Sequence, residues 1–205
     1  MVSKNSELRT QPKQSRARER VATILTAAEE MLASGEKVTT SSIAKKAGIP
    51  VGSVYRYFPD INAIYSQLFT AINGKMLNRV RQAFENPDPS SNWRTTFIQC
   101  MDIMRDTYVS NPAFGDLLLI MESPELRGIK ANVTEDISAA IAKRLQHGPD
   151  EFMGDDPDIV ARTVVELATA NELSFFLEKD PKTRDRLYSE WTKAIGSYLK
   201  LYLKG

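Results

Sequence analysis

The chain has 205 residues, of which 42% are hydrophobic, and its 27 basic and 26 acidic side chains give a net charge of +1. This length and composition predict a stable globular protein, with either one large domain or one small and one medium domain around a buried core. No apolar run approaches the roughly 20 residues of a membrane span, and the single cysteine, together with the lack of a signal-peptide pattern near Met1, predicts a protein of the reducing cytoplasm.

Residues 1–14 are polar and have no periodic apolar face, which predicts a disordered basic arm that carries Lys4, Arg9 and Lys13. The positive charge of the chain is concentrated at this end. Residues 1–60 hold ten basic and six acidic side chains, whereas the remainder holds 17 basic and 20 acidic ones. A polyanion is therefore a candidate partner. Such an excess is also ordinary for a solvated surface, so the interpretation depends on a motif.

Residues 15–60 form the first predicted domain, which contains three helices. Apolar residues recur at helical spacing over residues 16–34 and predict the first helix. Thr39 is a suitable N-cap for a short second helix, which Gly48 stops. A tight turn then leads to a third helix over residues 51–58.

Residues 61–205 form the second predicted domain, in which every periodic segment is again helical. The segments lie at 64–84, 93–110, 114–121, 124–145, 158–178 and 184–203. The segment 114–121 is so apolar that we expect it to be buried on all sides. Because no stretch has the pattern of a strand, the predicted fold class is all-α, with a three-helix N-terminal domain and a six-helix C-terminal domain.

The stretch from Thr39 to Phe58 has the pattern of a helix-turn-helix, whose second helix enters the major groove of DNA. Along it stand, in order, the pairs Ile43-Ala44 and Ala47-Gly48 and the group Tyr55-x-Tyr57-Phe58. Their order and spacing resemble the N-terminal pattern of the TetR family of bacterial repressors. The resemblance covers residues 16 to about 70 in sequence. The rest agrees with that family's six-helix ligand-binding and dimerisation domain in the number and length of its helices.

The resemblance implies a set of contacts with double-stranded operator DNA. Hydroxyl groups and free backbone amides at Thr39 and Thr40 would face phosphate, and Tyr55 corresponds to a phosphate-contacting tyrosine of the family. The start of the recognition helix would lie nearest the base edges, with Val51, Gly52 and Ser53. Two positions depart from the family pattern. Pro50 replaces a common capping serine, and Ile61 replaces a lysine that contacts phosphate.

Cationic side chains would complete this DNA-binding surface. Arg56 would bridge to guanine or to phosphate, and Lys45 and Lys46 would add positive charge nearby. The two lysines also fit a merely solvated surface. Tyr57 and Phe58 fit core packing better than DNA contact.

The resemblance also implies a repressor that is released from a palindromic operator by a small-molecule effector. The effector would be apolar or amphipathic, because adaptable methionine and aromatic side chains with one polar anchor suit such a ligand. The candidate effector-binding residues are Met101, Met104, Tyr108, Phe114, Leu118, Met121, Asn171 and Phe175. Stripes of this kind are also ordinary hydrophobic core, roughly two to one at each position.

The last two helices would pair with those of a second copy in a four-helix interface, which makes the protein a homodimer. The candidate interface residues are Phe176, Leu187, Trp191, Ile195 and Tyr198. The single histidine, His147, lies near a helix end and is expected to be a surface cap. We therefore expect neither a metal nor a cofactor.

Two other functions stay open. An enzyme fits poorly, because one histidine and one cysteine leave no nucleophile-base set, and the sequence has no phosphate-binding glycine loop or metal-ligand spacing. A pair of carboxylates acting on a glycoside is the remaining enzymatic possibility. Alternatively, a DNA-binding protein without an effector would use the C-terminal domain for dimerisation alone, and a filled, well-packed C-terminal core would support that version.

Overall fold

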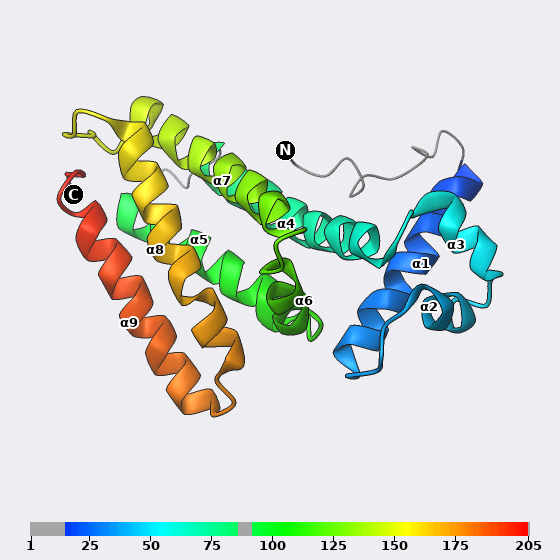
Figure 1. Cartoon of the computed structure of the whole chain (residues 1–205). Helices are drawn as coiled ribbons and strands as arrows, with labels where there is room; N and C mark the ends of the chain where they lie inside the picture. The colour runs from blue at the N-terminus through cyan, green and yellow to red at the C-terminus, as the bar shows by residue number, and fades with distance from the viewer. Residues whose placement is uncertain (1–14, 86–91, 205) are drawn as a thin grey trace. The chain divides into compact units, whose positions relative to one another are not determined.

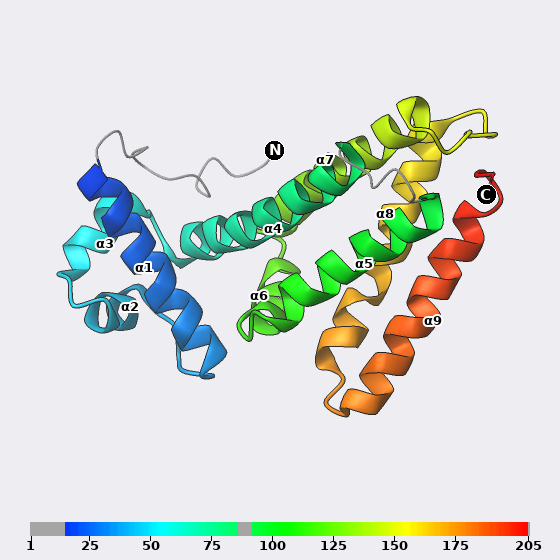
Figure 2. The same ribbon diagram turned by 180° about the vertical axis from the view of Figure 1, so that it is seen from behind.

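The computed structural model describes residues 15–85 and 92–204 of the chain. Within them the backbone forms nine α-helices, and an isolated antiparallel bridge joins Phe152 to Leu203 (Figures 1 and 2). The helices are α1 (Ser15–Ala33), α2 (Thr40–Lys46), α3 (Val51–Tyr57), α4 (Ile61–Glu85), α5 (Trp93–Val109), α6 (Phe114–Met121), α7 (Arg127–His147), α8 (Pro157–Leu177) and α9 (Pro181–Leu199). The predicted all-α fold class is confirmed.

The first three helices pack around one apolar cluster. Ile24 of α1, Ile43 of α2 and Val54 of α3 are each completely buried, and Phe58 at the end of α3 closes the cluster. A left-handed residue, Gly48 with a φ of 65°, ends α2 and begins the turn to α3. Glycine adopts this conformation without the steric strain that a Cβ would introduce. The short α2 and α3 therefore keep a fixed relation to each other.

The described residues divide into two compact units. The first unit comprises the residues up to Asn73 together with Tyr108–Lys130, and the second comprises Gly74–Thr107 and Ala131–Gly205. The long helix α4 runs from the first unit into the second, because its bounds enclose the division. The domain boundary that was predicted after residue 60 rests on the sequence pattern alone, and it stays a prediction.

The core of the second unit lies where α8 and α9 run side by side, as both views show. Each of these helices begins with a capping aspartate followed by a proline at the first helical position, a combination that favours a sharp start. Trp191 and Ile195 of α9 are buried against Phe175 and Val164 of α8. At the end of α9 the backbone N–H of Met153 donates to the carbonyl of Tyr202 at 2.8 Å, which fastens the loop before α8.

Two expectations about the helices after α5 are wrong in part. The helix expected from residue 124 begins at Arg127, because Ser123 to Leu126 form a tight turn in which the Leu126 N–H donates to the Ser123 carbonyl at 3.0 Å. The helix α6 is not buried on all sides. Its Phe114, Leu117 and Leu118 are buried, but Leu119 points outward and is 43% exposed.

Over residues 15–85 and 92–204, none of the helices is both long enough and apolar enough to cross a membrane.

Candidate functional site

The start of α2 is fixed by a reciprocal pair of hydrogen bonds. The side-chain oxygen of Thr39 accepts the backbone N–H of Ser42 at 3.0 Å, and the Ser42 hydroxyl oxygen accepts the backbone N–H of Thr39 at 2.8 Å. This capping box satisfies two backbone donors that the helix itself leaves unpaired. Thr39 thus has a structural task in addition to the phosphate contact that was predicted for it.

Two hydroxyl groups from different helices meet on the surface of the first unit. The Oγ1 atom of Thr40 at the start of α2 lies 2.9 Å from the phenolic oxygen of Tyr55 in α3. Tyr55 is 43% exposed although it is a large aromatic residue. Each hydroxyl has one proton, so while one group donates to the other, the second proton is free to donate to an oxygen-rich partner. The structure thus brings together two of the residues predicted to contact phosphate.

The first turn of α3 is open to solvent. Val51 is 43% exposed, Gly52 is exposed, and Pro50 precedes them as an N-cap that makes no side-chain cap hydrogen bond. A Cβ atom at Gly52 would meet no atom within 4 Å. The packing of the described chain therefore does not require a glycine at position 52. Close approach of a partner to the backbone is a remaining reason for a glycine there.

Two of the predicted cationic contacts, Arg56 and Lys46, differ in whether a carboxylate of the chain already pairs with them. Arg56 is exposed and its guanidinium lies 6.0 Å from the ring centre of Tyr57. The ammonium of Lys46 instead lies 3.1 Å from a carboxylate oxygen of Glu36 and 3.8 Å from one of Glu30. The hydrogen bond from Ser34, followed by the hydrogen bond and charge of Lys46, lowers the pKa of Glu36. Arg56 is the better placed of the two to meet an anion.

The neighbouring aromatic residues support the alternative that was left open for them. Phe58 is completely buried, and Tyr57 is half-buried and packed against the same cluster. They support the helices from within. Tyr55 is the aromatic side chain of this group that faces solvent.

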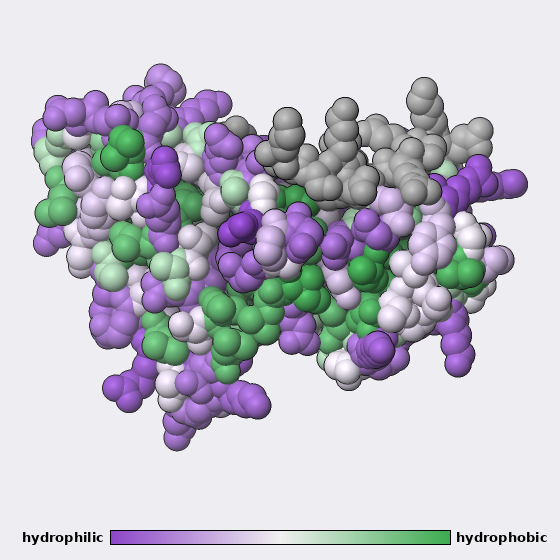
Figure 3. Space-filling model, in the orientation of Figure 1, coloured by the Kyte–Doolittle hydropathy of each residue, from purple (hydrophilic) through white to green (hydrophobic). Residues whose placement is uncertain are grey.

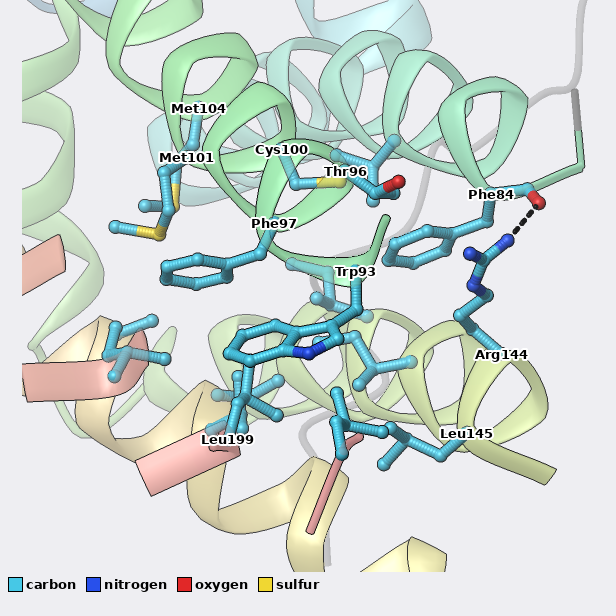
Figure 4. A pocket seen from close by; sticks show the side chains of 18 of the residues that line it. Phe84, Trp93, Thr96, Phe97, Cys100, Met101, Met104, Arg144, Leu145 and Leu199 are labelled. Atoms are coloured by element: carbon cyan, nitrogen blue, oxygen red, sulfur yellow. Dashed lines mark hydrogen bonds between the residues drawn. The ribbon is translucent and has the colours of Figure 1, made fainter. Parts of the chain in front are cut away.

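A cavity of about 120 Å³ lies within the second unit and is lined by residues of α4, α5, α7, α8 and α9 (Figure 4). Most of the lining is hydrocarbon, aromatic ring or thioether, with Met101, Met104 and Phe97 from α5 and Leu199 from α9. An engineered apolar cavity of roughly 150 Å³ binds benzene. The cavity of this chain therefore has the size for a small apolar molecule.

One edge of the cavity is closed by a buried ion pair. The guanidinium of Arg144 in α7 donates two hydrogen bonds to the carboxylate of Asp150, at 2.6 and 3.0 Å, and a third to the backbone carbonyl of Phe84 at 3.1 Å. Figure 4 shows the contact with Phe84. Both side chains of the pair are only 8% exposed. The positive charge of Arg144 is therefore balanced by Asp150 inside the second unit.

Three further polar groups line the cavity on α5. Thr96 is 3% exposed. Cys100 is half-buried, and its partial burial raises the pKa of the thiol to about 12. A thiol with that pKa is protonated and unreactive near neutral pH. The indole of Trp93 is 5% exposed, and its Nε1 atom has no hydrogen-bond partner among the described residues. An unpaired buried donor of this kind costs about 1–3 kcal/mol.

The structure places only Met101 and Met104 of the predicted effector-binding residues at this cavity. Tyr108, Phe114, Leu118 and Met121 lie in the core of the first unit, where the rings of Tyr108 and Phe114 stack with centroids 4.1 Å apart. Their stripe is core packing, the alternative that was left open. The actual lining includes Trp93, one helical repeat before Phe97 and two before Met101, so the stripe on α5 already carried a signal for it.

The two remaining effector candidates lie elsewhere in the second unit. Asn171 is exposed and its amide donates to the carbonyl of Leu167 at 3.0 Å, one turn earlier on the same helix. Phe175 is buried in an aromatic cluster with Phe176, Tyr188 and Trp191. Neither residue lines the cavity.

The predicted interface residues divide into buried and surface positions. Trp191 and Ile195 are 6% and 0% exposed inside a single chain, and the Trp191 indole donates to the carbonyl of Leu167 at 3.2 Å. They are core residues and are not available to a second copy. Leu187 is 40% exposed, whereas Phe176 and Tyr198 are half-buried. Figure 3 shows hydrophobic residues among hydrophilic ones over α8 and α9.

The single histidine lies in a surface groove. His147 ends α7 and shares the groove with Arg81 and Lys143. In the part of the chain that the structure describes, no group of three or more histidine, cysteine or carboxylate side chains is arranged to hold a metal ion.

Two protein-family descriptions match the chain. Residues 24–68 match bacterial regulatory proteins of the tetR family, and residues 93–199 match the tetracyclin repressor-like C-terminal domain. Together they cover α2, α3 and most of the cavity lining.

Two curated relatives are nucleoid occlusion factors named SlmA. The chain is 31% identical over 130 residues to the one from Vibrio cholerae serotype O1, and 24% identical over 133 residues to the one from Pasteurella multocida. The matched stretches make up 60% and 63% of this chain and 65% of each relative. The chain thus spans less than two thirds of their length.

Several solved structures share the fold. A TetR-family transcriptional regulator from Streptomyces coelicolor is 23% identical with a TM-score of 0.65, over 88% of this chain and 98% of that one. SmeT of Stenotrophomonas maltophilia, solved as a complex with triclosan, is 17% identical with a TM-score of 0.67, over 91% and 92% of the two chains. A transcriptional regulator from Cytophaga hutchinsonii is 16% identical with a TM-score of 0.72, over 90% and 99%.

Proposed function

The chain belongs to the tetR family of bacterial regulatory proteins, and from this premise we propose that it is a homodimeric repressor that binds a palindromic operator through α2 and α3. The observation that carries the proposal is the hydroxyl pair of Thr40 and Tyr55, 2.9 Å apart on the exposed side of these helices. One hydroxyl of the pair donates to the other, so the pair keeps one proton that is free to donate to an oxygen of a phosphate group.

The rest of the surface supports base contact at the start of α3. The backbone at Gly52 is open to close approach, and the exposed Val51 offers an apolar surface to a thymine methyl group. Ser53 follows in the same turn, and the exposed Arg56 lies one turn further on. Lys46 contributes less in this arrangement, because it must first leave its two carboxylate partners.

Dimerisation gives the palindrome its physical basis. Two recognition helices related by a two-fold axis meet successive major grooves when they lie ~34 Å apart. We assign the interface to the exposed side of α8 and α9, where Leu187 is 40% exposed and Phe176 and Tyr198 are half-buried. An isologous interface of this kind uses the same surface on both copies.

The effector site in this proposal is the cavity of the second unit. A ligand that binds more tightly to one conformation shifts the protein toward it, and release follows if that conformation cannot span the operator. SmeT, which shares the fold, was solved with triclosan bound. The open volume of the cavity favours this version over a dimerising domain without an effector, which needs no unfilled space.

Nucleoid occlusion is a second candidate role, favoured by the 31% identity to a nucleoid occlusion factor over 130 residues. Mapping of bound sites on the chromosome separates the two roles. A local repressor occupies one or a few promoters, whereas a factor that acts on the nucleoid as a whole needs sites dispersed along it.

The test of DNA binding is selection of bound sequences from a random pool at one fixed salt concentration. The wild-type chain should enrich a palindrome, and the double variant Tyr55→Ala with Arg56→Ala should lose it. Lys143→Ala, which removes an exposed cation from α7, outside both the helix-turn-helix and the assigned interface, is the matched control and should retain the palindrome. Absence of any enriched sequence with the wild-type chain at low salt would refute the proposal.

A single-atom variant sharpens this test. Tyr55→Phe keeps the ring and removes only the hydroxyl that meets Thr40. We expect about tenfold weaker binding to the selected operator, the size of one net hydrogen bond to phosphate. Unchanged affinity would mean that the hydroxyl pair does not contact DNA.

A further inference from the structure

The unpaired indole of Trp93 is the unusual polar group of the cavity. Its side chain is 95% buried, yet the Nε1 atom has no hydrogen-bond partner in the part of the chain that the structure describes. An indole N–H is a donor and never an acceptor, so only an acceptor atom can satisfy it. Buried donors in native proteins are nearly always paired, and an exception asks for an explanation.

The side chains named around this indole offer no acceptor to it. The guanidinium of Arg94 lies 4.6 Å from the centre of the ring, and a guanidinium only donates hydrogen bonds. In Figure 4 the indole nitrogen lies on the edge of the ring that is turned toward Leu145 and Leu199 and away from Thr96. A water molecule stays in a buried site when it has two to four polar partners. The leucine side chains provide none. A carbon-rich ligand that carries its own acceptor suits this position better than water does.

The charged groups of the lining argue against an anionic ligand. Among the lining residues the cation is Arg144, and it already donates to both oxygens of Asp150 and to the carbonyl of Phe84. The other carboxyl group of the lining, Glu172, is buried and has interactions of its own. An anion would enter without a cation to pair with it, which is unfavourable in a buried site.

We propose that the effector is a neutral, mainly apolar molecule with a single hydrogen-bond acceptor, and that Trp93 is the specificity-determining residue that donates to it. The inference rests on the proposed function, because it takes this cavity as the effector site. At about 120 Å³ the cavity holds a molecule near the size of a substituted benzene. The side chains that cover Nε1 must shift before a ligand atom can reach it. A ligand whose acceptor binds Nε1 therefore stabilises a conformation of the protein that differs from the empty one.

The test compares two ligands of nearly the same size, acetophenone and α-methylstyrene. The first has a carbonyl oxygen where the second has a methylene carbon. Calorimetric titration gives the dissociation constant of each for the full wild-type chain and for Trp93→Phe. Comparison of the ratio of the two constants between the wild-type chain and Trp93→Phe cancels the difference in hydration of the free ligands. We expect Trp93→Phe to shift this ratio about tenfold against acetophenone, the size of one net hydrogen bond.

A control variant separates the lost donor from the altered shape. Phe97→Leu also removes ring volume from the lining but leaves the indole N–H in place, so the ratio should stay as in the wild-type chain. In ¹⁵N-labelled protein, the indole N–H resonance that disappears in Trp93→Phe should move downfield with acetophenone and not with α-methylstyrene. A purely structural role of Trp93 would produce neither effect.

The inference would be overturned if Trp93→Phe left the ratio of the two dissociation constants unchanged. It would also be overturned if the wild-type chain bound neither ligand up to the solubility limit of that ligand. These failures are distinguishable from failure of the proposed function. If the chain selects an operator but binds neither ligand, the DNA-binding role stands and the inference about the cavity fails. If the chain selects no operator but Trp93→Phe shifts the ratio against acetophenone, the ligand class of the cavity stands and the proposed function fails.

Discussion

The core beneath α2 and α3 and the core around the cavity are built on different principles. In the first, Ile43, Val54 and Phe58 are all completely buried, and apolar side chains fill the space between α1 and the two short helices. The second contains an open volume of about 120 Å³, a buried ion pair at Arg144, and at Trp93 an indole donor that no described residue pairs with.

The difference follows from what each region has to do in the proposed function. A surface that reads DNA must hold its side chains in one geometry, and a close-packed core provides that rigidity. A ligand-responsive core must have more than one arrangement of similar free energy, and unfilled space with unsatisfied donors makes the empty arrangement less stable. Three predictions test this contrast by its effect on the free energy of unfolding, at one fixed protein concentration because dimers are stabilised by mass action.

The largest effect is expected from Phe58→Ala. Removal of a completely buried aromatic ring from a close-packed cluster should lower the free energy of unfolding by about 4 kcal/mol. Ile141→Ala is the comparison variant, because this half-buried residue lines the cavity. It should cost about 1–2 kcal/mol, since part of its surface has no packing partner to lose. Urea denaturation measures both, and equal losses would break the contrast between the two cores.

A smaller loss is expected from Asp150→Asn in the second unit. The substitution leaves the guanidinium of Arg144 buried without a counter-charge, which should lower the free energy of unfolding by about 3 kcal/mol. The double variant Arg144→Leu with Asp150→Leu removes both charges and should lose clearly less. If the double variant unfolds as easily as the single one, the pair stabilises by packing and not by compensation of charge.

The smallest effect is expected at the start of α2. Thr39→Ala removes the oxygen that accepts the Ser42 N–H and should lower the free energy of unfolding by about 1 kcal/mol. Thr39→Ser keeps the acceptor and should behave as the wild-type chain does. A loss with serine as large as that with alanine would show that the methyl group matters and the cap does not.

The DNA-binding candidates were accessible to sequence analysis because their arrangement is local. Thr40 and Tyr55 are 15 residues apart, and the helix, turn and helix between them are specified by a capping threonine, a left-handed Gly48 and the buried Ile43 and Val54. Only the pairing of Lys46 with Glu36 and Glu30 was not visible, because nothing in the spacing of charges says which of them will meet.

The cavity was accessible only in part. Met101 and Met104 were identified on α5, and Trp93 belongs to the same helical stripe. Tyr108 continues that stripe by periodicity, yet it lies in the other compact unit and donates its hydroxyl toward Asn73 at 3.3 Å. Periodicity describes one face of a helix, and a long helix can present that face to two different cores.

The sequence by itself determined that the chain is all-α, where most helices begin and end, and which short motif resembles a DNA reader, because capping, helical periodicity and turn chemistry act over a few residues. Only the tertiary structure decided that Trp191 and Ile195 lie in the core and not at the surface, that Arg144 meets Asp150, and that the indole N–H of Trp93 has no partner among the described residues. Burial and pairing depend on how distant helices pack together, and an apolar stripe looks the same in sequence whether it covers a core, a cavity or a second copy of the chain.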